Sequence, residues 1–127
     1  MTTNKGPIAR LTEIAAALPG VIAKMDAAKN DLAQRMASLE QLGLIYATVH
    51  MKDGKYATLL YPIQPGQPRR RKYVGRDPQK IMDAKDAIQR AKDYDELAKQ
   101  GERLDMVLAQ GYRSLQEATR ELTSWRP

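Results

Sequence analysis

The sequence predicts an α+β fold that is mostly α, in which two long amphipathic, coiled-coil-like helical segments flank a small three-stranded antiparallel β-meander. Residues 7–42 and 77–125 place apolar side chains at helical spacing, whereas residues 43–76 contain β-prone runs separated by turn residues. The 127 residues include 28% charged side chains, no Phe and one Trp. We therefore expect one elongated domain with a thin core rather than a thick globular one.

The first helical segment, 7–42, carries an apolar seam with a period of seven. Its positions are Leu11, Leu18, Met25, Leu32 and Leu39, with Ile14, Val21, Ala28, Arg35 and Leu42 three residues after each. Pro19-Gly20 interrupts the run. The segment is therefore predicted to be either one kinked helix or a short helix followed by a longer one.

The second helical segment begins at Asp77-Pro78, an N-cap residue followed by proline at the first helical position. An apolar face that starts at Ile81 passes into a second seam with a period of seven, which continues nearly to the C-terminus. Gly101 and Gly111 lie on this seam. They either allow close helix approach or, at Gly101, separate two helices.

The two seams have two interpretations, which are compatible with each other. A helical hairpin would bury the seams against each other within one chain, whereas a homodimer would pair them between chains. At about 1.5 Å per residue the second helix would be longer than the first. Dimerisation through the helical seams would cover the part that extends beyond the hairpin.

Residues 44–63 contain two β-prone runs on either side of Asp53-Gly54. Asp-Gly favours a two-residue type I′ turn, since both central residues take a positive φ. This turn predicts that Met51 pairs with Tyr56. The side of the hairpin toward a helix would then carry Ile45, Ala47, Val49, Met51, Tyr56 and Leu60, with Tyr46, Thr48, His50, Leu59 and Tyr61 on the other side.

A basic third strand is predicted after the Pro- and Gly-rich loop at 64–68. With a period of two, Arg69, Arg71 and Tyr73 would share one face, and Arg70, Lys72 and Val74 the other. Gly75 would end this strand before the second helical segment.

The positive charge of the chain is concentrated in its middle third. The formal net charge is +6, and residues 43–80 carry eight basic against two acidic side chains, while residues 1–42 carry five against four. Four of the six tyrosines also lie there. Basic side chains neutralise phosphates, tyrosines stack on bases, and a small sheet fits the major groove of DNA. The middle third is therefore predicted to bind nucleic acid, with DNA favoured over RNA.

The candidate nucleic-acid-binding residues are Lys52, Lys55, Arg69, Arg70, Arg71, Lys72, Tyr73 and Arg76. Two other interpretations of the basic run stay open. It could bind an acidic protein partner, or it could keep an edge strand from aggregating. The alternative function is therefore a non-enzymatic coiled-coil adaptor or inhibitor, which would bind a protein partner through its basic segment or through its seams.

The composition argues against several classes of function. With no Cys and one His, the sequence offers no disulfide framework, thiol chemistry or histidine metal cluster. We expect no cofactor, no metal site and no enzymatic activity. No signal peptide or 18-residue apolar span is apparent, so we expect a cytoplasmic protein without membrane attachment.

The stretch from Gly54 to Leu97 joins a Gly-Lys hairpin, a basic strand ending in Tyr-Val and a helix with a Tyr-x-x-Leu ending. In this it resembles small uncharacterised proteins of plasmids, phages and transposons, many of which carry a Cys-rich segment before the hairpin that this chain lacks. The resemblance implies a mobile-element setting. Three strands followed by a helix are also similar in topology to the sheet-reading DNA-binding domains of some integrases and plant transcription factors.

Overall fold

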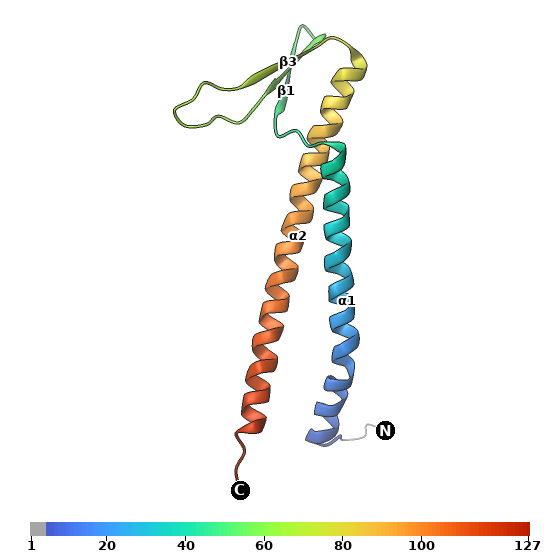
Figure 1. Cartoon of the computed structure of the whole chain (residues 1–127), viewed down its shortest axis with the longest axis vertical. Helices are drawn as coiled ribbons and strands as arrows, with labels where there is room; N and C mark the ends of the chain where they lie inside the picture. Colours follow the sequence, from blue (N-terminus) through green and yellow to red (C-terminus); the bar gives the residue numbers. More distant parts are fainter. Residues whose placement is uncertain (1–4) are drawn as a thin grey trace. The chain divides into compact units, whose positions relative to one another are not determined.

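The computed structural model describes residues 5–127, which form two helices and three strands (Figure 1). In chain order these are α1 (Pro7–Leu42), β1 (Thr48–Lys52), β2 (Tyr56–Leu60), β3 (Arg71–Gly75) and α2 (Pro78–Thr123). The helices make up about two thirds of the described residues. The strands form one antiparallel sheet in the order β1-β2-β3. The predicted α+β, mostly α fold, with a meander between two helical segments, is confirmed.

The chain divides into two compact units. One consists of the chain up to Ala33 together with Gly101–Pro127, and the other is Gln34–Gln100. The second unit, which we call the sheet unit, holds all three strands, the last turns of α1 and the first half of α2. Every candidate nucleic-acid-binding residue lies in the sheet unit.

Both helices continue through the residues that the sequence marks as candidate breaks. Pro19 lies inside α1, and α2 runs without interruption past Gly101 and Gly111. A Cβ atom added to either glycine would meet no atom within 4 Å. The expectation that Gly101 separates two helices is therefore wrong, and within one chain neither glycine is at a close helix approach.

In the unit that contains Gly101–Pro127, the apolar seams are only partly covered. Lys29 Nζ of α1 lies 3.2 Å from Asp105 Oδ1 of α2. Half-buried seam residues are Leu18, Met25 and Leu32 of α1 and Gly101, Leu104 and Leu108 of α2. Large apolar side chains that stay exposed on the seams are Leu11, Ile14, Val21, Leu115, Leu122 and Trp125.

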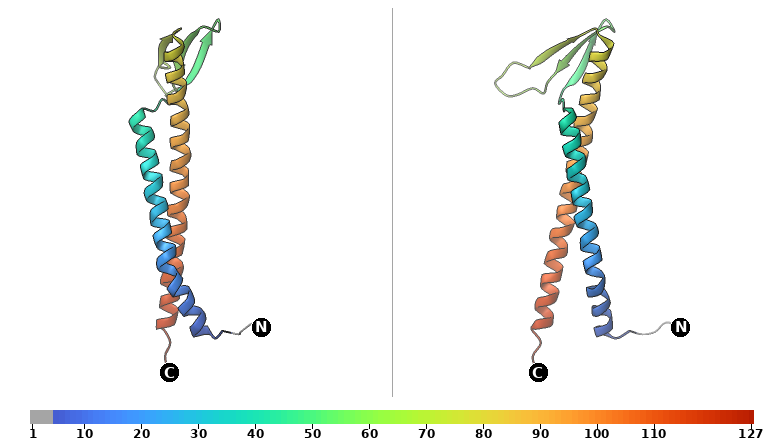
Figure 2. Two further views of the ribbon diagram at one scale, coloured as in Figure 1. Left: turned by 90° about the vertical axis from the view of Figure 1, so that its right-hand side faces the viewer. Right: turned by 45° about the vertical axis from the view of Figure 1, so that its right-hand side comes forward.

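The core of the sheet unit lies between β2 and the first half of α2. Ala57 and Leu59 are only 1% and 2% exposed, and Ala84, Ala87 and Ala91 are the buried residues of α2. The three alanines occupy one helix face and are small, so the sheet packs directly against that face. Figure 2 shows the sheet beside the first turns of α2 from two directions.

Two groups of hydrogen bonds connect α2 to the segment between α1 and β1. Arg90 Nε donates to the carbonyl of Gly43 at 2.8 Å, and its Nη2 donates to the carbonyl of Leu42 at 3.1 Å. These carbonyls lie at the end of α1, where the helix itself supplies no donor. The Ile45 N–H donates to the carbonyl of Ala87 at 3.2 Å. The chain therefore enters β1 from a fixed position on α2.

The β1–β2 turn has the predicted type but a different register. Asp53 and Gly54 have φ values of 55° and 67°, and the Lys55 N–H donates to the Lys52 carbonyl at 3.1 Å, as in a type I′ turn. The strands, however, pair Lys52 with Tyr56. Lys55 is thereby left outside the pairing. The predicted register is wrong by one residue.

This shift exchanges the two faces of β2. Leu59 is buried on the side that packs against α2, whereas Tyr56 and Leu60, which were predicted to pack there, lie on the opposite face. The predicted inward faces of Val49 and Met51 agree with the structure, where both are half-buried. β2 has apolar residues on both faces, so its sequence does not distinguish the two registers.

β3 begins two residues later than predicted and contains an irregularity. Tyr73 pairs with Thr58 and Gly75 with Ala57, so Val74 is an extra residue opposite the step between Ala57 and Thr58. A bulge of this kind increases the local twist and bends the strand. It lies immediately before the connection to α2.

The observed register can be tested by truncating two neighbouring leucines. Leu59→Ala should lower the free energy of unfolding by about 2–5 kcal/mol, because it opens a cavity in the core. Leu60→Ala is the matched control and should cost about 1 kcal/mol or less. Urea unfolding followed by circular dichroism measures both. A larger loss for Leu60→Ala would contradict the register.

Gly101→Ala should raise the free energy of unfolding by about 0.5–1 kcal/mol. Alanine has a better helix propensity than glycine, and the added methyl group meets open space. The same denaturation measurement applies. A destabilised variant would show that Gly101 has a packing role that this structure lacks.

Candidate nucleic-acid interface

The face of the sheet opposite to Leu59, here called the outer face, follows from the strand pairing. Its row nearest the α1–β1 connection still borders α2, because Thr48 and Leu60 line a cavity of about 260 Å³ with Ile88 and Ala91. Residues directly opposite each other in an antiparallel sheet share a face. The cross-strand rows of the outer face are Thr48, Leu60 and Arg71; His50, Thr58 and Tyr73; and Lys52 with Tyr56. This face therefore combines two cations, two tyrosines, one histidine and two hydroxyl side chains.

The side chains at the edges of the outer face are open to solvent. Tyr73 is 66% exposed, and His50, Lys52 and Arg71 are also exposed. Tyr56, Thr58 and Leu60 belong to the central strand and are half-buried between their neighbours. A ligand that lies across the sheet would therefore meet a tyrosine ring and an arginine on one edge, and a histidine and a lysine on the other.

The four consecutive basic residues, 69–72, do not form one patch. The strand β3 begins only at Arg71, and side chains along a strand point alternately to its two faces. Arg71 and Tyr73 share the outer face, as predicted. Lys72 pairs with Leu59 on the side toward α2 and lines a cavity of about 360 Å³ beside Lys80 and Asp83. Lys72 is therefore separated from the outer face by the sheet itself.

Arg69 and Arg70 precede β3 and are engaged with Tyr61. Arg69 Nε donates to the Tyr61 carbonyl at 3.0 Å, and the Arg70 guanidinium carbon lies 4.2 Å from the centroid of the Tyr61 ring. The prediction that the strand begins at Arg69, so that Arg69 and Arg71 share a strand face, is wrong. Both arginines instead hold the start of the β2–β3 loop.

Lys55 and Arg76 lie at the hairpin end of the sheet unit. With Lys85 of α2 they line a cavity of about 440 Å³, whose apolar lining includes Met51 and Ile81. Neither belongs to the rows of the outer face. Of the eight predicted site residues, the outer face thus brings together Lys52, Arg71 and Tyr73.

The cations of the sheet have no acidic partner in the part of the chain that the structure describes. Ion pairs there include Lys5 with Glu13 and Lys29 with Asp105, but none involves Lys52, Lys55, Arg69, Arg70, Arg71, Lys72 or Arg76. The positive charge of the middle third is therefore not compensated within the sheet unit. Uncompensated charge of this kind attracts polyanions and steers their approach.

His50 and Thr58 were not among the predicted site residues, although they share a row with Tyr73. Alternation along a strand gives the relative direction of side chains within that strand only. Which residues of different strands meet depends on the register, and the predicted register was shifted. The preference of Leu59 for burial could have identified them. If Leu59 points into the core, its neighbour Thr58 points to the opposite face, together with its strand partner His50.

No protein-family model, curated protein or solved structure matches this chain. Within residues 5–127, no three His, Asp or Glu side chains are grouped as metal ligands. No helix among the described residues is long and apolar enough to cross a membrane.

Proposed function

We propose that this protein binds duplex DNA through the outer face of its sheet. The observation that carries the proposal is the exposed pair Arg71 and Tyr73 on one edge, opposite His50 and Lys52 on the other. Among residues 5–127 no acidic side chain pairs with Arg71 or Lys52. Arginine and lysine would neutralise phosphates and release counterions. Tyr73 would stack or contact a sugar, and Arg71 has the geometry to contact a guanine edge.

Duplex DNA is preferred over duplex RNA because of the width of the grooves. A small antiparallel sheet fits the major groove of B-form DNA, whereas the major groove of A-form RNA is too narrow and deep for side chains to read. The bulge at Val74 bends β3. A bent, twisted sheet follows the curved wall of a groove better than a flat one.

In this proposal the protein is a binding protein rather than an enzyme. The resemblance of residues 54–97 to small proteins of plasmids, phages and transposons supports an accessory or regulatory role in a mobile genetic element. A role as an adaptor for a protein partner is the alternative, and the binding experiment below separates the two.

Arg71→Ala should weaken duplex DNA binding about tenfold and lower the salt slope by about one. Lys72→Ala is the matched control, since it removes the same charge from the same strand on the opposite face. It should weaken binding less than about threefold. Fluorescence anisotropy with labelled duplex DNA, at low and near-physiological salt, measures both. Duplex RNA, tested in parallel, should bind more weakly than DNA.

Equal losses for the two variants would show that binding follows net charge rather than the outer face. If neither duplex bound even at low salt, DNA binding would be excluded, and the adaptor alternative would replace it. Replacing Arg69, Arg70 and Arg71 together would be less informative, because Arg69 and Arg70 hold the β2–β3 loop.

We further propose that two copies of the chain pair through the exposed seam residues of α1 and α2. Both helices repeat their apolar positions every seven residues, so a second copy offers a seam of matching period. Val21, Leu115 and Leu122 are among the large apolar seam residues that remain exposed in one chain. A dimer would present two sheets to one DNA molecule and raise the overall affinity.

Light scattering after size-exclusion chromatography should give twice the 14.3 kDa chain mass for the unmodified protein. Leu115→Asp should shift it to the monomer mass, because a charge would be buried in the paired seam. Met106→Asp is the control, since Met106 is 69% exposed and lies off the seam. A monomer at every concentration, or an equal effect of both variants, would contradict dimerisation through the seam.

A further inference from the structure

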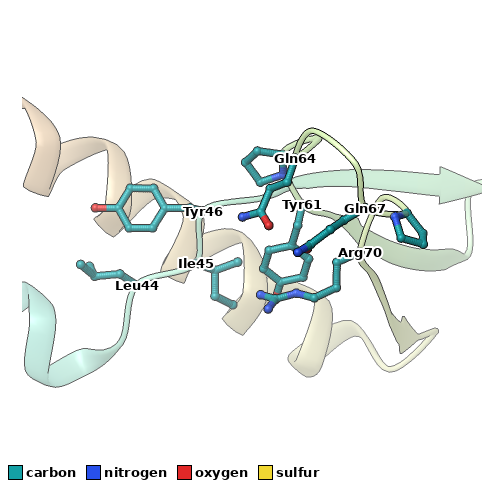
Figure 3. Close-up of a pocket in the computed structure, with 9 residues that line it drawn as sticks. Leu44, Ile45, Tyr46, Tyr61, Gln64, Gln67 and Arg70 are labelled. Atoms are coloured by element: carbon teal, nitrogen blue, oxygen red, sulfur yellow. The ribbon is translucent and has the colours of Figure 1, made fainter.

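A cavity of about 490 Å³ opens beside the β2–β3 loop of the sheet unit (Figure 3). Its lining combines apolar, aromatic, amide and cationic side chains. The lining residues are Leu44, Ile45, Tyr46, Tyr61, Pro62, Gln64, Gln67, Pro68 and Arg70. A volume of this size is in the range of small-ligand sites, in which a few polar groups fix the orientation of the ligand.

The cation of this cavity, Arg70, is held in place by the Tyr61 ring. The Arg70 guanidinium lies over the Tyr61 ring, and Figure 3 shows the two side chains next to each other on the cavity wall. A guanidinium held over a ring keeps its N–H groups free at its edge. Within residues 5–127 no carboxylate pairs with Arg70. The site therefore offers a positioned fork of donors to an anionic oxygen.

The wall of the cavity is fixed by hydrogen bonds to the backbone, one of them from the Arg69 side chain. The Tyr61 N–H donates to the Arg70 carbonyl at 3.0 Å, and the Tyr61 carbonyl accepts from Arg69. In the loop, the Gln67 N–H donates to the Gln64 carbonyl at 3.2 Å. This turn brings two glutamine amides to the same cavity, where each offers both donors and an acceptor.

Tyr46 closes another side of the cavity. Its hydroxyl donates to Asp95 Oδ1 at 3.0 Å. Partial desolvation, followed by this hydrogen bond, raises the pKa of Tyr46 above its ordinary value. The phenol is therefore neutral near pH 7, and its hydrogen is directed to Asp95 rather than into the cavity. The polar side-chain groups left for a ligand are those of Arg70, Gln64 and Gln67, with the Tyr61 hydroxyl beside them.

This cavity is separate from the outer face. Tyr61 and Arg70 each lie one residue beyond Leu60 and Arg71, so strand alternation places them on the opposite side of the sheet from Arg71. A duplex that lies on the outer face would not reach them. The ligand of the cavity must therefore be distinct from the paired DNA of the proposed function.

We propose that the cavity binds a nucleoside monophosphate unit, with its phosphate on Arg70 and the edge of its base on the amides of Gln64 and Gln67. Glutamine amides match the donor and acceptor pattern of base edges, and arginine takes phosphate oxygens bidentately. Leu44, Ile45 and the Tyr61 ring would cover the apolar faces. The unit is either a free nucleotide or an unpaired nucleotide at the end of a strand.

Isothermal titration calorimetry of the full chain with the four ribonucleoside monophosphates tests this directly. At least one should bind saturably with a Kd on the order of 1 mM or tighter. Adenosine and inorganic phosphate, each lacking one half of the ligand, should bind at least about tenfold more weakly. In the unmodified protein, the side-chain amide resonances of Gln64 and Gln67 should shift on titration.

Arg70→Ala should weaken nucleotide binding about tenfold or more, and Gln64→Ala with Gln67→Ala should reduce it to the level of inorganic phosphate. Arg71→Ala is the control and should leave nucleotide binding unchanged while it weakens duplex binding. Duplex DNA with one unpaired 3′ nucleotide, compared with a blunt duplex, identifies the source. If the unpaired nucleotide raises the affinity for the duplex and Arg70→Ala removes that increase, the ligand is a strand end. If free monophosphates bind but the unpaired nucleotide does not raise the affinity for the duplex, the ligand is a free nucleotide.

The proposal is overturned if no monophosphate binds up to about 10 mM, or if inorganic phosphate binds as well as the nucleotides. It is also overturned if Arg71→Ala and Arg70→Ala weaken nucleotide binding equally. The two proposals can fail separately. If nucleotides bind but duplex DNA does not, only the proposal for the outer face is contradicted. The amide shifts of the unmodified protein keep the test valid if a variant fails to fold.

Discussion

Burial of Ala57 and Leu59 against the alanine face of α2 is the interaction on which the rest of the sheet unit depends. Leu59 is 2% exposed and borders the same cavity as Ala84, and the buried residues of α2 are all alanines, whose small side chains let the sheet lie against the helix. Because side chains alternate along a strand, fixing Leu59 inward fixes Thr58 and Leu60 outward. The pairing of β2 with β1 and β3 then determines every member of the outer face. The composition of the candidate interface is therefore a consequence of core packing.

The same alternation explains why four consecutive basic residues serve different purposes. Arg71 belongs to the outer face and Lys72 to the side toward α2, while Arg69 and Arg70 hold the loop at Tyr61. A basic run in a helix or a disordered tail would present its charges together, but a strand divides them between two surfaces. This division is the basis for two anion-binding proposals in one small sheet.

Much of the fold was predictable from the sequence, because long periodic segments and strong turn residues are local signals. The helical periodicity gave the two helices, and Asp53-Gly54 gave the type I′ turn that the structure contains. The register was not predictable, because Lys55 stays unpaired and β2 is apolar on both faces. The roles of Arg69 and Arg70 depend on contacts with Tyr61, which no local pattern specifies. The side of the sheet that carries His50 was predicted, but its row with Thr58 and Tyr73 became apparent only once the register was known.

The most direct test of the outer face as a DNA-binding surface is a titration of the isotope-labelled protein with duplex DNA, followed by two-dimensional NMR. Amide resonances of His50, Thr58, Arg71 and Tyr73 should shift together, and the shifts should diminish as salt is added. The amide resonances of Ala84, Ala87 and Ala91, on the other side of the sheet, should change little. Shifts confined to the helices, or shifts that do not respond to salt, would contradict the assignment of the outer face.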